Sequence, residues 1–171
     1  MAPLRPRLRA EHPADAAAID AVVRAAFAPL ARSSHTEHHI VRALRAANAL
    51  AVSQVAELDG ALVGHAAASP ITIGDGTAHW FGLGPVAVAA AWQRRGIGAA
   101  LVQATLRELR ARGAAGCVVF GHADYYPRFG FARDPALVLP GLPQDHFFAL
   151  RWRGPAPAGD VAYHAAFAAT D

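Results

Sequence analysis

The sequence has 171 residues, of which 54% are hydrophobic and 17% are charged, and its formal net charge is +3. This composition excludes a disordered chain and fits one folded domain over residues 1–171. All 16 basic side chains are arginine, which excludes a Walker A phosphate loop and Schiff-base chemistry, because both need lysine. The arginines form no basic stripe, so we expect no nucleic-acid partner.

Hydropathy and cysteine content indicate where in the cell the protein is expected. No run of 18 apolar residues occurs, and the N-terminal stretch has no apolar segment, so we expect neither a membrane span nor a secretory signal. Cys117 is the only cysteine. An intrachain disulfide and a cysteine-based zinc site are therefore excluded, and a cytoplasmic location is expected. Its apolar neighbours predict a buried strand cysteine rather than a nucleophile.

The apolar pattern predicts a mixed α/β fold without a regular alternation of strands and helices. Ser34 and Glu37 are spaced as a capping box at the start of a helix, and Asp59-Gly60 is typical of a tight hairpin turn. In chain order, the expected elements are a strand at 4–10, helices from Pro13 to before Pro29 and from Ser34 to Leu44, strands at 49–58, 61–73 (bent near Ser69-Pro70) and 78–88, a helix at 96–112, a strand at 115–120, a short helix at 124–129, and strands at 147–152 and 160–164.

The segment after Val88 carries the first chemical signal. An arginine-containing loop follows the predicted strand, and Gly96 and Gly98 open the next helix. Free N–H groups at a helix N-terminus bind anions, and glycine lets an anion approach the backbone closely. Arg94 and Arg95 add positive charge beside it. The pattern predicts a diphosphate-binding loop, and the alternative is a helix start that uses glycine only for tight packing.

Two motifs in this region resemble the GNAT N-acetyltransferase superfamily. Gln93-Arg-Arg-Gly-Ile-Gly98 matches its Q/R-x-x-G-x-G/A signature, and Tyr126-Pro-Arg-Phe-Gly-Phe131 is similar to its Y-x-x-x-G-F segment. The segments 83–88 and 121–131 are especially similar to the YhbS-like branch. The resemblance covers most of the chain. It implies the GNAT acyl-CoA N-acyltransferase fold, a mostly antiparallel twisted sheet with one splayed pair of parallel strands, flanked by helices.

The resemblance also implies a reaction and its site. Acetyl-CoA would be the co-substrate, and a primary amine would attack its thioester directly. Tyr126 would act as general acid toward the leaving thiolate, with Tyr125 as its rival. The short loop 121–124 lacks the asparagine that many members carry at this place. Acetyl-CoA would lie between the strands that end near Val88 and Phe120. Its pantetheine arm would contact Val86, Ala87 and Val88. Its pyrophosphate would contact Arg94, Arg95, Gly96, Ile97, Gly98 and Ala99.

The acceptor side carries no motif. Glu37 and His79 are candidates for a general base or an acceptor contact, and their structural alternatives are a helix cap and an ordinary strand histidine. His35 and His39 share a helix face and could chelate a metal, but no third ligand is apparent, so we expect no metal. The acceptor amine and the choice between monomer and homodimer stay open. The alternative function is a non-catalytic acyl-CoA-binding module on the same fold.

Overall fold

Strands and helices alternate irregularly in the computed structural model, which describes residues 5–171. A 3₁₀ turn at Pro13–Asp15 leads into the first α-helix, and another, η3, spans Tyr126–Phe129. In chain order the main elements are β1 (Arg7–Ala10), α1 (Ala16–Phe27), α2 (Glu37–Ala46), β2 (Val52–Leu58), β3 (Ala61–Ile73), β4 (Trp80–Val88), α3 (Ile97–Ala111), β5 (Gly116–Phe120), β6 (Leu137–Val138), β7 (Phe147–Arg151), β8 (Gly159–Tyr163) and the 3₁₀ turn η5 (Ala165–Ala168).

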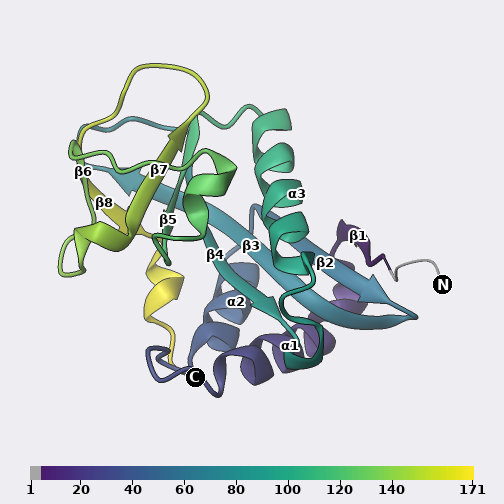
Figure 1. Ribbon diagram of the computed structural model, residues 1–171. Coiled ribbons are helices and arrows are strands. Elements are labelled where there is room, and N and C mark those ends of the chain that lie inside the picture. The colour runs from purple at the N-terminus through teal and green to yellow at the C-terminus, as the bar shows by residue number, and fades with distance from the viewer. Residues whose placement is uncertain (1–4) are drawn as a thin grey trace.

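One twisted sheet organises the molecule (Figure 1). Its main strand order is β1-β2-β3-β4-β5-β7, while β8 pairs with β3 and β6 pairs with β8. Every pairing is antiparallel except β4 with β5 and β6 with β8. The predicted fold class, a mostly antiparallel α/β sheet with one central parallel pair and flanking helices, is confirmed.

The long strand β3 takes part in two ladders. It pairs with β4 as far as Pro70 and with β8 from Ile71 onward, so the predicted bend near Ser69-Pro70 marks a change of partner. At its other end, Asp59 and Gly60 have φ angles of 48° and 81°. Positive φ at both central residues is what a type I′ hairpin needs, and the predicted turn is confirmed.

The helices cover opposite faces of the sheet (Figure 1). Residues of α3 pack with Ala68 of β3 and Leu83 of β4, whereas residues of α1 pack with Val55 of β2 and Ala87 of β4. Apolar side chains at helical spacing, Leu101 and Leu109 among them, are almost fully buried on α3. The 3.6-residue period that predicted this helix therefore marks the face that the sheet covers.

Charged groups tie the N-terminal strand to the first helix. The Arg9 guanidinium donates to Asp15 at 2.7 Å and to Glu57 at 3.1 Å. These bonds join β1, the turn before α1, and β2. The guanidinium and the backbone N–H of His12 hold the pKa of Asp15 at about 2, below its ordinary 3.8, because both stabilise the carboxylate form.

Three expectations about local structure differ from the fold. The capping box is wrong: α2 begins at Glu37 with Thr36 as its N-cap, the Ser34 hydroxyl bonds to the Thr36 hydroxyl, and Glu37 accepts a hydrogen bond from Ser33. The expected helix at 124–129 is only the 3₁₀ turn η3. The two-residue strand β6 was not expected, since it is too short to show a period. Leu4, the start of the first expected strand, lies outside the described residues.

Candidate active site

The parallel strands β4 and β5 separate within the sheet. Their pairing runs from Trp80 opposite Gly116 to Leu83 opposite Val119 and stops there. Beyond Leu83, β4 continues to Val88 beside β3. One edge of this continuation, which contains Val86, Ala87 and Val88, thus has no strand partner among residues 5–171. Its backbone groups are available to hydrogen-bond an extended amide-containing ligand.

The loop after β4 presents the start of α3. The Gln93 side-chain amide donates to the Val88 carbonyl at 3.0 Å and holds the loop against the end of the strand. Gly96 has a φ of 82°, and a Cβ there would meet nothing within 4 Å. Arg94 and Arg95 are exposed, and the Arg95 guanidinium lies 5.0 Å from the centre of the Trp92 ring. Free N–H groups, open space and positive charge together suit a phosphate.

Two tyrosines follow β5 and turn different ways. The Tyr126 ring packs on Gly121, where a Cβ would overlap it, and joins the apolar cluster that contains Leu83. A Cβ on Gly98 would lie 3.4 Å from the Tyr125 hydroxyl, so Tyr125 borders the start of α3. The two ring centres are 5.2 Å apart and the rings are nearly perpendicular. Turn η3 therefore sends Tyr126 toward the separated strands and Tyr125 toward the glycine loop.

Burial governs the protonation of Tyr126. It raises the pKa of this phenol from 10 to about 12, with smaller contributions from neighbouring Tyr125 and Cys117. The phenol is therefore protonated at neutral pH. A protonated hydroxyl at this place can donate a proton to a leaving group as its negative charge develops.

Glu37 and His79, the two predicted base candidates, lie in different parts of the molecule. One carboxylate oxygen of Glu37 accepts from Ser33, and the other, Oε2, is buried without a partner among the described residues. His79 is exposed and comes directly before β4, where its carbonyl accepts a hydrogen bond from Ala115. This is the opposite end of β4 from Val86–Val88, roughly 23–30 Å away at the rise of a β-strand. The structure does not bring His79 to the separated strand ends.

The histidines of α2 form a small cluster. The rings of His38 and His39 lie 3.9 Å apart, and His38 is buried, which lowers its pKa. Across residues 5–171, no group of three or more His, Cys, Asp or Glu side chains could hold a metal ion. Nor does any helix in that part of the chain have the length and apolar character to cross a bilayer.

Tyr163, which belongs to no motif in the sequence, lies close to the separated strands. Its ring covers Gly82 of β4, where a Cβ would overlap it. Its hydroxyl is buried and has no hydrogen-bond partner among the described residues. Gly82 was the available signal, since a glycine inside a strand often marks the close approach of another group. Only the return of β8 to β3 reveals which group approaches.

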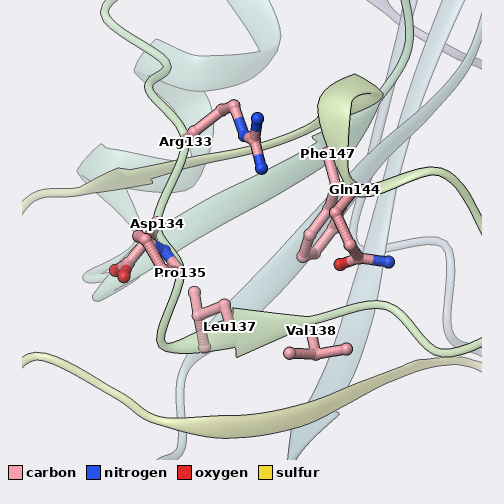
Figure 2. A pocket seen from close by; sticks show the side chains of 7 residues that line it. All are labelled: Arg133, Asp134, Pro135, Leu137, Val138, Gln144 and Phe147. Carbon is pink, nitrogen blue, oxygen red and sulfur yellow. The ribbon is translucent and has the colours of Figure 1, made fainter.

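A cavity of about 190 Å³ lies elsewhere, between the segment around β6 and the start of β7. Figure 2 shows Arg133 and Asp134 on one side of it and Gln144 and Phe147 on the other. The Gln144 side chain accepts from the Leu139 N–H and donates to the Leu139 carbonyl. None of the predicted site residues lines this cavity, so it plays no part in the proposed chemistry.

Comparison with known proteins identifies the class of this fold and site. A sequence model described as the acetyltransferase (GNAT) family matches residues 18–131. That match spans both predicted motifs and the separated strands. The chain belongs to the GNAT acetyltransferase family, and it is an acetyltransferase of that class.

Individual relatives make the assignment more specific. The chain is 32% identical to the uncharacterized N-acetyltransferase YhbS of Escherichia coli (strain K12) over 155 residues, which is 90% of this chain and 84% of the relative. The crystal structure of a GNAT family acetyltransferase from Brucella melitensis in complex with acetyl-CoA has a TM-score of 0.86 and 47% identity, covering 96% of this chain and 99% of that one. Escherichia coli YhbS in complex with CoA also has a TM-score of 0.86, with 32% identity and coverages of 96% and 92%. The predicted resemblance to the YhbS-like branch is confirmed.

Proposed function

We propose that this chain is a single-domain N-acetyltransferase that moves an acetyl group from acetyl-CoA to a primary amine by direct attack. One observation carries the proposal: the unpaired edge of β4 leads directly into the exposed glycine loop that opens α3. Relatives at 47% and 32% identity hold acetyl-CoA and CoA in their crystal structures, which supports the same ligand here.

In this proposal, acetyl-CoA lies along β4 and across the start of α3. Backbone groups of Val86, Ala87 and Val88 hydrogen-bond the amides of the pantetheine arm. The N–H groups at the start of α3 bind the pyrophosphate, with Arg94 and Arg95 beside it. The residues of this loop are Arg94, Arg95, Gly96, Ile97, Gly98 and Ala99. The Val86 N–H polarises the thioester carbonyl, as an oxyanion-hole donor does.

The transfer step needs a neutral amine and a proton donor. The amine nitrogen attacks the thioester carbonyl, so a C–N bond forms and, when the tetrahedral intermediate collapses, the C–S bond breaks. CoA leaves as a thiolate, and Tyr126 gives it the phenolic proton. Tyr126 suits this role because its phenol is protonated at neutral pH. The proton that the amine loses goes to a base on the acceptor side, for which Glu37 is our candidate.

The experiment that tests this function has two stages. Acetyl-CoA should raise the melting temperature, since a ligand that binds only the folded state stabilises it. Thiol release should then be measured with a panel of polyamines, aminoglycosides, amino acids, simple monoamines and peptide N-termini. Stabilisation with no thiol release from any amine would favour the alternative, a non-catalytic acyl-CoA-binding module. No stabilisation would contradict the proposed co-substrate.

The cellular setting that we propose is the cytoplasm. Cys117 is fully buried and burial raises its thiol pKa, so it is an inert reduced cysteine with no partner for an intrachain disulfide. Such cysteine usage suits a reducing compartment. A monomer or a homodimer would each leave the proposed acetyl-CoA path within one chain.

A further inference from the structure

Tyr163 lies where β4 and β5 part, on the face of the sheet opposite to α3. It pairs with Ile71 in the ladder between β8 and β3. Its ring covers Gly82, which pairs with Val118 one position before the last β4–β5 pair. Tyr126 reaches the same strand ends from the α3 side, in the cluster with Leu83. The two phenols thus approach the proposed transfer point from opposite faces.

Two hydroxyl groups near Gly82 are buried and lack hydrogen-bond partners among the described residues. One belongs to Tyr163, and the backbone of Phe120 lies near it. The other belongs to Ser69, which pairs with Gly82 between β3 and β4 and so lies on the same face as Tyr163. Buried hydroxyls almost always have partners. Ser69 and Tyr163 thus place two unpartnered hydroxyl oxygens on one face of the sheet, around one glycine next to the strand separation.

The surroundings of these hydroxyls are apolar. Tyr163 packs against the cluster that contains Ile71, Trp80 and Val118, and its ring centre lies 4.8 Å from that of Phe167. Phe120, at the end of β5, is 38% exposed. An ammonium ion is strongly disfavoured in such a setting. An uncharged amine is not, because it can donate its N–H groups to hydroxyl oxygens.

We propose that Tyr163, together with Ser69, binds the attacking amino group of the acceptor, and that the acceptor is a primary monoamine with an apolar body. The inference rests on the proposed function. The two hydroxyl oxygens accept the two N–H groups of the amine and leave its lone pair free to attack the thioester carbonyl. Burial raises the pKa of the Tyr163 phenol, so it stays neutral. The exposed ring of Phe120 provides a surface for the apolar body.

Calorimetry with benzylamine as the probe tests this assignment, in the presence and absence of saturating CoA. We expect the Kd of benzylamine to rise tenfold or more in Tyr163→Phe and severalfold in Ser69→Ala, with acetyl-CoA affinity unchanged in both. Thr72→Val is the matched control, because Thr72 is an exposed hydroxyl residue on the other face of β3. It should bind benzylamine as the wild type does.

Stability separates a binding role from a structural one. Removing a buried hydroxyl that has no partner should not lower the melting temperature, so weaker benzylamine binding at an unchanged melting temperature supports the proposal. Equal benzylamine affinity in Tyr163→Phe and wild type, no benzylamine binding by the wild type, or equally tight binding of spermidine would each overturn it. Tyr163-dependent benzylamine binding without thiol release would overturn acetyl transfer alone and leave this assignment standing.

Discussion

The two sides of the proposed site are built in different ways. The acetyl-CoA side is one continuous segment, from the end of β4 through the glycine loop into α3, and it offers mainly backbone groups. The acceptor side combines side chains from α2, β3 and β8, which are far apart in the sequence: Glu37, Ser69 and Tyr163. A site made of backbone groups needs particular residues, such as glycine, at neighbouring positions, so it leaves a motif in the sequence. A site made of distant side chains constrains the local sequence weakly, and the acceptor identity is therefore harder to infer.

Tyr126 lies between the two sides, and its substitution should have the largest effect. We expect Tyr126→Phe to lower kcat by roughly 10- to 1,000-fold, because the leaving thiolate loses its proton donor. Acetyl-CoA affinity should barely change, since the ring and its packing on Gly121 remain. Steady-state thiol release and calorimetry measure the two quantities separately.

Tyr125→Phe is the matched control for this experiment. Tyr125 is adjacent and chemically identical, but its ring is nearly perpendicular to that of Tyr126 and lies toward α3. It should keep most of the activity. If Tyr126→Phe turns over at the wild-type rate, the general acid is another group or solvent.

Gly98→Val tests the acetyl-CoA side alone. We expect the affinity for acetyl-CoA to fall tenfold or more, on the order of 1.4 kcal/mol, because a branched side chain occupies the approach of the pyrophosphate. The Cβ itself fits, with the Tyr125 hydroxyl at 3.4 Å and Val88 Cγ2 at 3.6 Å, so the fold should persist. Gly98→Ala should therefore show a smaller loss in calorimetry. Unchanged affinity in a folded Gly98→Val variant would contradict the phosphate-binding role of this loop.

Glu37→Gln tests the acceptor side alone. We expect kcat/KM for the amine to fall about tenfold, because the amide cannot take the proton that the attacking amine loses. Calorimetry should show unchanged acetyl-CoA affinity. Glu108→Gln is the control, since Glu108 pairs with Arg112 on the surface of α3. If Glu37→Gln keeps wild-type kinetics across a pH series, Glu37 is not the base, and its role is the structural contact with Ser33.

Asp15→Asn should have the smallest effect, and it acts on the scaffold rather than on either side of the site. Its folded-state pKa of about 2 lies below the ordinary 3.8. The carboxylate therefore stabilises the fold above pH 4, and this stabilisation is lost as the pH falls toward 2. We expect the melting temperature to drop by about 2 °C at pH 7. Wild type and variant should converge near pH 2.

The control for this pH dependence is Asp145→Asn. Asp145 pairs with Arg133 but its side chain is 81% exposed, so its removal should leave the melting curves almost unchanged. Parallel melting temperatures of wild type and Asp15→Asn at every pH would show that the bond to Arg9 does not contribute to stability.

The sequence predicted the elements whose signals are local. The hairpin at Asp59-Gly60, the long helix α3 with Gly113 after it, and the succession of strands along the chain, β6 excepted, all follow from turn chemistry and period. The start of α2 was misjudged, because Ser33, Ser34 and Thr36 are all plausible caps and the sequence does not choose among them. Of the proposed acetyl-CoA contacts, those around Gly96 and Gly98 could be named in advance because their role depends on backbone geometry.

Apart from Glu37, the residues of the proposed acceptor side could not be predicted, for topological reasons. His79 was selected because it lies on the predicted strand 78–88, which leads to the separated strands, but parallel pairing with β5 begins next to it and ends far from it. Tyr163 was overlooked because nothing near it in the sequence indicates that β8 joins β3 at Ile71. Long-range strand pairing decides both cases, and a single sequence does not encode it in any local pattern.

The shared strand β3 has a consequence for how this protein can change over evolution. Because its first part supports the β4 ladder and its last part supports β8, an insertion or deletion of one residue between the two parts would turn the side chains of one part to the wrong face relative to the other. Drift in β3 is therefore restricted to substitutions. New acceptor preferences should arise in α2, β8 and their flanking loops, where changes leave the strand that carries the acetyl-CoA side in place.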